Sequence, residues 1–357
     1  MPHFSVDQLN RMARALLAAA GTPEDIAGVV AGSLVESNLK GVDSHGVMQL
    51  PWYLEEVEKG AIEPAARPEI EHKAPSAALV RGNKGFGIYA LSRATELAVE
   101  TAQDQGAACV GLTECSHTGR IGYFAEAAAR QGLFAMIMGG GAHRIWSNVV
   151  PFGGTKPIMS TNPYALAMPG GRFGPVVVDF ATSTVADGKI AVHRAEGRAV
   201  PEDWILDKHG QPTTDPEAFF DGGMHRPAAG HKGYGLGLIA ELIGDAALAA
   251  PPEFNWFVVA VNLGAFRPPA AYAETAETYL QFVKDVPPAA GFDEVLLPGE
   301  PERRAAKRRC TEGIPVPDPV WEQLMATGRS VGVDLDAIVR KAGSDGEAGG
   351  GRPAKGC

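Results

Sequence analysis

The stretch GVDSHGVMQLPWY, residues 41–53, places a histidine in a turn between two helical patterns. Apolar side chains recur at helical spacing over residues 26–35 before it, and residues 50–59 are expected to form the next helix. His45 has an unperturbed pKa of about 6.5, which suits proton transfer at neutral pH. Asp43 and Ser44 are placed to orient its ring, and Gly46 leaves space for a ligand. The stretch therefore predicts an acid–base histidine at a junction between helices.

The residues that precede this turn predict a helical unit. Ser5 and Gln8 form a capping-box pair, and apolar residues then recur at helical spacing until Gly21 ends the helix. Thr22 and Pro23 supply an N-cap and a first-turn proline for a second helix. Two helices are thus expected before the histidine turn and one directly after it.

The composition is that of a globular chain without a polyanionic partner. Of 357 residues, 45% are hydrophobic and 21% are charged. This is enough for a large core and about two structural units. The net charge of -10 and the lack of a long Lys/Arg run give no electrostatic footprint for nucleic acid or anionic lipid.

The same sequence is expected to belong to a cytoplasmic protein. Charges at Asp7, Arg11 and Arg14 interrupt the apolar residues of the N-terminus, so it does not resemble a secretory signal. No apolar run reaches the roughly 18 residues that a membrane-spanning helix needs. The cysteines form no C-x-x-C and no metal-type cluster, and we expect free thiols in a reducing compartment; they lie at 109, 115, 310 and 357.

Beyond residue 75 the chain alternates between strand and helix patterns. Residues 61–75 carry three prolines and no clean periodicity, which indicates a crossing out of the helical unit. The alternation that follows favours an α/β or α+β domain. Strands are expected at 78–81, 109–114, 133–139, 164–169, 176–182 and 256–262, and helices at 82–102, 123–131, 234–248, 270–285, 318–327 and 334–342.

Several familiar motifs are missing. The sequence has no G-x-S-x-G elbow, no phosphate-binding P-loop, no H-E-x-x-H and no G-x-G-x-x-G fingerprint, so a Rossmann dinucleotide site is unsupported. Gly82, Gly85 and Gly87 form G-x-x-G-x-G, which we interpret as a tight strand-to-helix turn rather than an anion site. No metal site is expected.

Two further stretches place polar residues at the start of a predicted helix. SHTGRIGY, residues 116–123, follows a strand pattern, and the amides at such a helix start suit a phosphate group. GHKGYGL, residues 230–236, places Lys232 at another helix start. A cation there opposes the helix dipole, so a bound anion would compensate it.

Taken in order, these stretches resemble the malate/L-lactate dehydrogenase family of the non-Rossmann type, which includes ureidoglycolate, sulfolactate and diketogulonate dehydrogenases or reductases. The similarity extends from about residue 5 to residue 335. The matching text is GVDSHGV at 41–47, SHTGRIGYF at 116–124, VPFGG at 150–154, STNP at 160–163, DFATS at 179–183, GK at 188–189, GHKGYGL at 230–236 and PGE at 298–300.

The resemblance implies a fold and an activity. The implied fold is α/β with a mixed sheet: a helical domain from both chain ends, residues 1–74 plus 293–342, and a central cofactor-binding domain, residues 75–292. The glycine-rich residues 343–357 are expected to be a disordered tail. The implied activity is hydride transfer between NAD(P)H and a 2-oxo or 2-hydroxy acid, in a homodimer whose active site lies near the subunit interface. NAD is the expected cofactor, and the sequence leaves NADP open.

The resemblance also implies roles for individual residues. His45 takes the position of the proton donor or acceptor, with Ser44 beside it, and His117 is a second candidate for acid–base chemistry or substrate contact. Helix-start amides and Lys232 would neutralise a pyrophosphate, and a carboxylate such as Asp179 would hold a hydroxyl. The implied cofactor-binding residues are Thr118, Gly119, Arg120, Ile121, Gly122, Asp179, Ala181, Thr182, Lys232 and Gly299; the implied substrate-binding residues are Gln49, Thr161, Asn162 and Lys189.

Gln49 departs from the family pattern and leaves the substrate open. Many relatives have Arg four residues after the motif histidine, where it suits bidentate binding of a carboxylate. Either Arg120 or Lys189 binds the carboxylate instead, or the substrate is not a simple 2-oxo acid. A cyclic imino acid reductase and a catalytically inactive nucleotide-binding protein therefore remain alternatives. A hydrolase is disfavoured, because adjacent residues such as Ser44 and His45 do not face each other.

Overall fold

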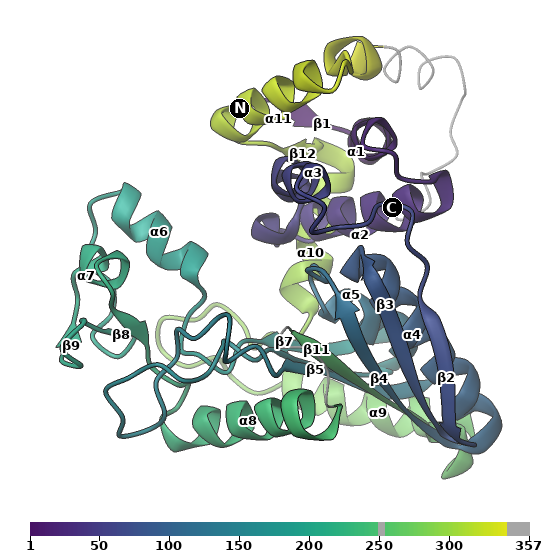
Figure 1. Cartoon of the computed structure of the whole chain (residues 1–357). Helices are drawn as coiled ribbons and strands as arrows, with labels where there is room; N and C mark the ends of the chain where they lie inside the picture. The colour runs from purple at the N-terminus through teal and green to yellow at the C-terminus, as the bar shows by residue number, and fades with distance from the viewer. Residues whose placement is uncertain (249–253, 341–357) are drawn as a thin grey trace.

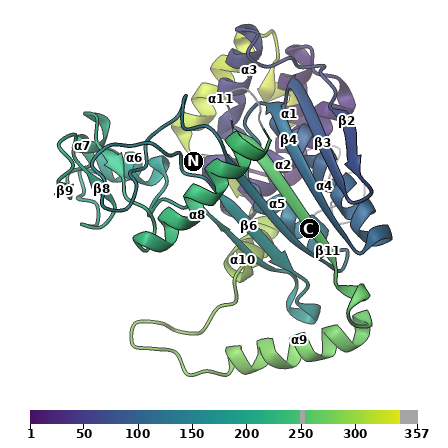
Figure 2. The same cartoon turned by 60° about the horizontal axis from the view of Figure 1, so that its bottom comes forward.

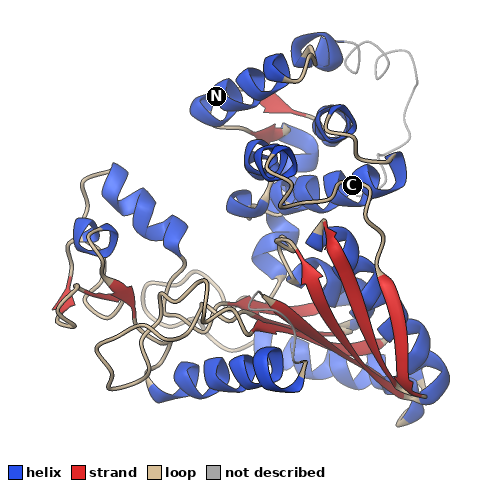
Figure 3. Ribbon diagram, viewed as in Figure 1, coloured by secondary structure: helices blue, strands red, loops and turns tan. Residues whose placement is uncertain are grey.

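The structure, a computed structural model, describes residues 1–248 and 254–340. Figures 1 and 3 show a layer of helices above a twisted sheet, helices against the sheet, and an outer lobe of short elements to one side. Both ends of the described chain contribute to the upper layer. The mixed α/β fold expected from the sequence is confirmed.

The helical layer combines α1 (Val6–Ala19), α2 (Glu24–Leu39) and α3 (Leu50–Glu58) with α10 (Glu300–Glu312) and α11 (Asp318–Ser330). The capping box of Ser5 and Gln8 is confirmed, with both reciprocal hydrogen bonds present. Thr22 was expected to cap α2, but Pro23 is the N-cap and makes no side-chain cap bond. A short antiparallel pair, β1 (His3–Phe4) and β12 (Ile314–Pro315), joins the two chain ends.

The central sheet has seven strands in the order β2-β3-β4-β11-β5-β6-β7. Its only parallel pair within the described chain is β3 with β4, so the sheet is mixed. The strands are β2 (Glu69–Ala74), β3 (Ala77–Gly85), β4 (Ala107–Cys115), β5 (Leu133–Gly140), β6 (Tyr164–Met168), β7 (Val176–Phe180) and β11 (Asn255–Asn262).

Alternation along the strands gives the sheet two apolar faces. Ala135 and Ile137 of β5 belong to the main core, which α4 (Gly87–Gln105) and α5 (Gly122–Ala129) cover. Met138 lies in a second cluster with Ala240 of α8 (His231–Glu241). Because side chains of a strand point to opposite faces in turn, the two clusters lie on opposite sides of the sheet. The helices α4 and α8 lie on different sides of the sheet in Figures 1 and 2.

The outer lobe comprises α6 (Asp187–Ala195), α7 (Pro216–Phe220) and a three-stranded sheet of β8 (Ile205–Leu206), β9 (Pro212–Thr213) and β10 (Met224–His225). Its small core contains Val185, Ile190, Val200 and Ile205. The sequence patterns gave no expectation for this lobe, because its strands have two residues each and carry no readable periodicity.

Three other expectations need correction. The proline-rich crossing contains β2, an edge strand whose six residues are all exposed. Residues 82–85 extend strand β3, and the following helix begins only at Gly87. The helix expected at 234–248 starts at His231 and continues after Glu241 as a π-helix, Leu242–Ala247. The helix expected at 270–285 is confirmed as α9 (Pro269–Lys284).

The cysteines follow the sequence expectation only in part. Cys109 is a free thiol, as expected. Cys310 is engaged in a disulfide, contrary to the expectation, and Cys357 lies outside the described residues, as does the expected tail. Nowhere in residues 1–248 and 254–340 is a helix long and apolar enough to cross a membrane.

We predict that Gly244→Ala destabilises the fold. A Cβ at Gly244 would lie 2.3 Å from the carbonyl oxygen of Gly140, where the π-helix packs on the end of β5. Overpacking of this kind costs about 1–3 kcal/mol, measured as the free energy of unfolding in urea. The control is Gly235→Ala on α8, where a Cβ meets no atom within 4 Å. An equal loss in both variants would contradict the assignment of the effect to this contact.

Candidate active site

His45 lies in a 3₁₀ turn, Asp43–His45, directly after α2. The Nδ1 atom of its ring is 3.0 Å from the hydroxyl of Ser44. The side-chain amide of Gln49 donates to the carbonyl oxygen of Ser44 at 2.7 Å. The turn expected from the sequence is therefore present, and Gln49 is one of the groups that hold it.

His117 lies opposite His45, in the loop that joins β4 to α5. The two imidazole rings stack with centroids 5.8 Å apart. The hydroxyl of Tyr53 on α3 is 2.9 Å from Nδ1 of His117. Gly87 supports the same loop, because a Cβ there would overlap the carbonyl oxygens of Ser116 and His117. The G-x-x-G-x-G pattern is thus a structural turn whose last glycine positions His117.

Burial shifts the pKa values of these three rings in favour of their neutral forms. The pKa of His45 is lowered by burial and by the nearby Arg120 cation. The pKa of His117 falls to about 4, through burial and the proximity of His45. Burial raises the pKa of Tyr53 well above its usual value. At neutral pH His117 and Tyr53 are therefore uncharged.

A buried group of charges lies beneath the two histidines. Arg120, from the loop after His117, binds Glu36 of α2 at 2.9 Å. Lys40, at the end of α2, binds Glu36 at 2.6 Å and also Glu126 of α5. The Nε atom of Arg120 is buried and has no hydrogen-bond partner among the described residues. The helical layer and the sheet layer thus meet through paired charges, and Arg120 keeps one donor available.

The remaining residues of the loop lead into α5. Thr118 is fully buried, and its hydroxyl has no partner in the described part of the chain. Gly119 has φ 68°, and Ile121, two residues later, is the N-cap of α5. The amide of Gly122 donates to the carboxylate of Asp179 on β7 at 2.8 Å. The anion at this helix start is therefore Asp179 itself, which joins the loop to β7.

A second group of predicted residues lies where β7 ends. Thr182 donates to the carbonyl oxygen of Thr161 through its amide, at 2.8 Å, and through its hydroxyl, at 3.0 Å. Asn162 donates to Gly237 at 3.1 Å and to Glu241 at 2.9 Å, both on α8. Asn162 has φ 36°, and its Oδ1 atom is buried without a partner among the described residues. Asp179 and Thr182 are three residues apart, with Ala181 between them, so the end of β7 connects both groups.

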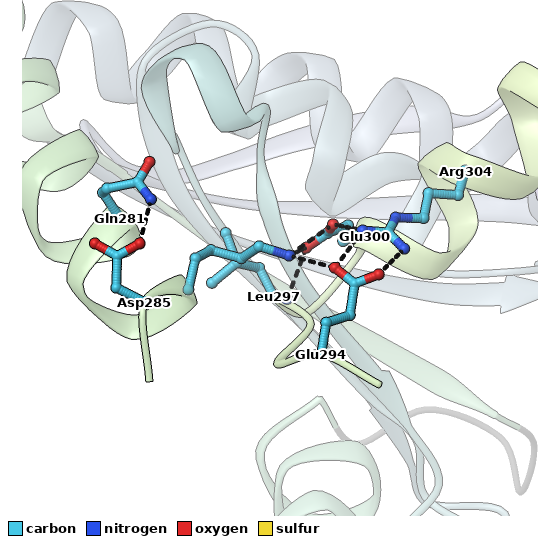
Figure 4. A network of polar contacts seen from close by, with 7 residues as sticks. Gln281, Asp285, Glu294, Leu297, Glu300 and Arg304 are labelled. Carbon is cyan, nitrogen blue, oxygen red and sulfur yellow. Dashed lines mark hydrogen bonds and ion pairs between the residues drawn. The ribbon is translucent and has the colours of Figure 1, made fainter. Parts of the chain in front are cut away.

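Gly299 lies against β7 as well. It has φ 84°, and a Cβ there would lie 3.3 Å from Cβ of Val177. Figure 4 shows the polar network that holds its loop, where Glu294 and Glu300 face Arg304. Lys284 of α9 binds both carboxylates at 3.0 Å. The loop with Gly299 is thus fixed between α9 and α10.

Two predicted lysines lie away from the histidine pair. Lys232 is exposed at the start of α8, a helix whose N-cap, Gly230, provides no side-chain cap bond. Lys189 is exposed on α6 in the outer lobe, and no hydrogen bond or ion pair between described residues joins it to the histidine pair. The structure therefore brings together most of the predicted residues but leaves Lys189 apart.

Tyr53 and Glu241 were not predicted as site residues. Tyr53 follows the histidine motif within the same stretch, but an aromatic residue at helical spacing is most simply interpreted as core. Glu241 is a buried carboxylate that accepts from Ser160, Asn162 and Gly141. An acidic residue within an otherwise apolar helix pattern, IAELIG, was the available signal.

This chain is similar along nearly its whole length to known proteins. The family model described as malate/L-lactate dehydrogenase matches residues 4–325. The ureidoglycolate dehydrogenase (NAD(+)) of Escherichia coli O157:H7 is 30% identical over 90% of this chain and 95% of its own length.

Two solved structures share the fold. Sulfolactate dehydrogenase from Methanocaldococcus jannaschii superposes with a TM-score of 0.86 at 29% identity, over 94% of this chain and 99% of that one. The Δ1-piperideine-2-carboxylate reductase of Pseudomonas syringae pvar. tomato gives 0.81 at 26%, over 92% and 100%. With a family model that matches nearly its whole length and relatives covered almost end to end, this chain belongs to the malate/L-lactate dehydrogenase family.

Proposed function

We propose that this protein is an NAD-dependent dehydrogenase that interconverts a 2-hydroxy acid and its 2-oxo acid. The observation that carries the proposal is the stacked pair of His45 and His117, in which the ring of His45 contacts the Ser44 hydroxyl and the ring of His117 contacts the Tyr53 hydroxyl. The family membership and the NAD(+) in the name of the ureidoglycolate enzyme support the reaction class and the cofactor. NADP remains open as a second cofactor.

The two histidines take different roles in this proposal. His45 donates a proton to the carbonyl oxygen during reduction and removes it during oxidation, with Ser44 in hydrogen-bond contact with its Nδ1. His117 is neutral, and its contact with Tyr53 fixes the orientation of the ring. It therefore binds the substrate oxygen through a hydrogen bond rather than through charge.

The residues at the end of β7 fit a dinucleotide. Among the described residues the hydroxyl of Thr118 has no hydrogen-bond partner, so it offers a donor. Gly299 lies close to β7 and has no side chain, so it leaves space for the ligand. Lys232 at the start of α8 would neutralise the pyrophosphate, together with amides of that helix start. When bound, the nicotinamide supplies or accepts the hydride. We assign Thr118, Gly119, Ile121, Ala181, Thr182, Lys232 and Gly299 to this role, whereas the amide of Gly122 and the carboxylate of Asp179 already bind each other.

Because residue 49 is Gln and not Arg, another side chain must bind the substrate carboxylate. The amide of Gln49 is already bonded to Ser44, so Gln49 contacts a substrate only by giving up that bond. Arg120 retains a buried Nε without a partner among the described residues, and it influences His45 electrostatically. We propose Arg120 for the carboxylate, with Thr161 and Asn162 beside it. Lys189 remains a weaker candidate because of its place in the outer lobe.

A cyclic imino acid reductase is the second candidate. The observation that favours it is the piperideine carboxylate reductase on the same scaffold, together with the replacement of the usual arginine by Gln49. The carbon of an imine, like that of a ketone, is electrophilic and can accept a hydride. His45 would then protonate the nitrogen instead of the oxygen. Turnover of a cyclic imino acid, without turnover of any 2-oxo acid, would establish this candidate.

The proposal predicts consumption of NADH with at least one 2-oxo acid. The measurement follows NADH and NADPH absorbance with purified protein across oxaloacetate, pyruvate, 3-sulfopyruvate, other 2-oxo acids and a cyclic imine. Turnover with one acid names the cofactor and the substrate class. Tight NADH binding with no turnover of any compound would contradict the proposal and favour a nucleotide-binding protein.

His45→Gln is predicted to lower kcat by about a hundredfold or more, because general acid–base catalysis contributes about 10²–10⁴. The affinity for NADH, measured by fluorescence titration, should change little. His117→Gln should raise KM as well as lower kcat, because it removes a substrate contact. Unchanged turnover in His45→Gln would remove this residue from the mechanism.

We further propose that the protein is a homodimer and that α8 and α9 form its interface. No residue of α9 is buried, and its aromatic side chains Phe282 and Tyr279 are 71% and 65% exposed. The α8 helix buries mainly small residues and exposes Leu236, Leu238 and Ile239. Helices with unpartnered apolar faces require a covering surface, and a second copy of the chain supplies a self-complementary one. We keep the cytoplasm as the proposed location.

Ile239→Glu is expected to convert the dimer to a monomer in sedimentation velocity at micromolar concentration, because a carboxylate would be buried at the interface without a partner. The control is Ile70→Glu, an equally apolar residue exposed on the edge strand β2. The control should remain dimeric. A dimer that survives Ile239→Glu would place the interface elsewhere.

A further inference from the structure

The turn that carries His45 is held from a distant part of the chain. Arg309 of α10 binds both carboxylate oxygens of Asp43, at 2.7 and 3.0 Å, and also the carbonyl oxygen of Asn38. Asp43 is the first residue of the 3₁₀ turn that His45 ends. A planar guanidinium that makes two parallel bonds to a carboxylate fixes direction as well as distance.

Asn38 completes the clamp at the other side of the turn. Its side-chain nitrogen, Nδ2, donates to the carboxylate of Asp43 at 2.7 Å, and its side-chain oxygen, Oδ1, accepts from the backbone amide of Val47 at 2.8 Å. Gly46 lies against this side chain, where a Cβ would come within 2.2 Å of Asn38 Oδ1. The residues before and after His45 are therefore both bonded to the buried side chain of Asn38, whose backbone carbonyl oxygen accepts from Arg309.

The helix that carries Arg309 also borders the proposed cofactor loop. Its N-cap is Gly299, and Arg303 donates to the carbonyl oxygen of Pro175 next to β7 at 2.6 Å. From Gly299 to Arg309 the helix rises about 15 Å, at about 1.5 Å per residue. One end of α10 is thus fixed at the sheet edge and the other at the histidine turn.

We infer that Arg309, acting through Asp43 and Asn38, is a positioning residue that sets the orientation of His45 and neutralises the carboxylate beside it. This inference rests on the proposed role of His45. Arg309 does not touch the substrate; it determines where the ring points and which charges surround it. The charged and titratable groups around His45 are Asp43 on its own turn, Arg120 and His117 on the loop after β4, and Tyr53 on α3.

The test compares Arg309→Met and Arg309→Lys with Arg308→Met as the matched control. Arg308 is exposed on the same helix, and its one ion pair within the described residues is a long contact of 3.9 Å to Glu312. A displacement of a reacting group by about 1 Å costs up to about a hundredfold. We therefore expect kcat to fall about tenfold to a hundredfold in Arg309→Met and less in Arg309→Lys, with unchanged NADH affinity and unchanged kinetics in Arg308→Met.

The pH profile separates positioning from a loss of general stability. In Arg309→Met the carboxylate of Asp43 is no longer neutralised, so it favours the imidazolium form and raises the pKa of His45. The inflection of kcat/KM for oxidation should move to higher pH. The double variant Arg309→Met/Asp43→Asn removes the unpaired charge and should return the inflection toward that of the unmodified protein, even where kcat stays low.

Two outcomes would overturn the inference. Wild-type kcat and inflection in Arg309→Met, while His45→Gln is inactive, would contradict the role of Arg309 and leave the proposed function intact. An active His45→Gln would contradict the proposed function itself. If Arg309→Met does not fold, by circular dichroism, Asp43→Asn measures the same two quantities: it leaves the Arg309 cation unpaired, so kcat should fall and the inflection should move to lower pH, and an unchanged kcat and inflection would also contradict the inference.

Discussion

The site depends on the buried ion pairs that join the helical layer to the sheet layer. Glu36 of α2 and Glu126 of α5 bind Lys40 and Arg120 where the layers meet, and Arg130 also binds Glu126. Burying such charges costs desolvation energy that only well-made pairs offset, and a shifted docking would leave a charge unpaired. Because His45 follows α2 and His117 precedes Arg120, this one contact brings the two rings together.

The rest of the architecture extends that contact. The loop after β4 reaches β7 through Asp179, and the end of β7 reaches α8 through Thr182 and Asn162. The C-terminal α10 then returns from the sheet edge to the histidine turn. Residues that are far apart in sequence therefore share one site. Both ends of the described chain lie in the helical layer, and α10 joins that layer to the sheet (Figure 1).

Much of the fold could be predicted from local patterns. The capping box of Ser5, the strand at 133–139 and the helix at 270–285 have strong periodic or capping signals, and all three were confirmed. The edge strand β2 was missed because both of its faces are exposed, so no apolar alternation marks it. The π-helix after α8 arises from the packing of Gly244 on Gly140, a tertiary contact with no local signature.

The site was predictable in its motifs and less so in its geometry. His45 stands out as a titratable ring beside a glycine at a helix junction, and His117 was identified through the family resemblance, yet nothing in the sequence gives their 5.8 Å stacking. Gln49 was identified as a departure from the family pattern, but its bond to the Ser44 carbonyl emerged only from the structure. Arg309 lies in a helix rich in Arg and Lys, where its pairing with Asp43 cannot be distinguished by pattern from that of its exposed neighbours.

The most direct measurement is the pH dependence of kcat/KM for oxidation of a 2-hydroxy acid with NAD⁺. Oxidation requires neutral His45, whose pKa is lowered from its ordinary value by burial and by Arg120. The rate should therefore rise with unit slope at acidic pH, and its inflection should lie below the ordinary histidine pKa of about 6.5. A single inflection above neutral pH, or a flat profile, would contradict the account of His45 as the acid–base group.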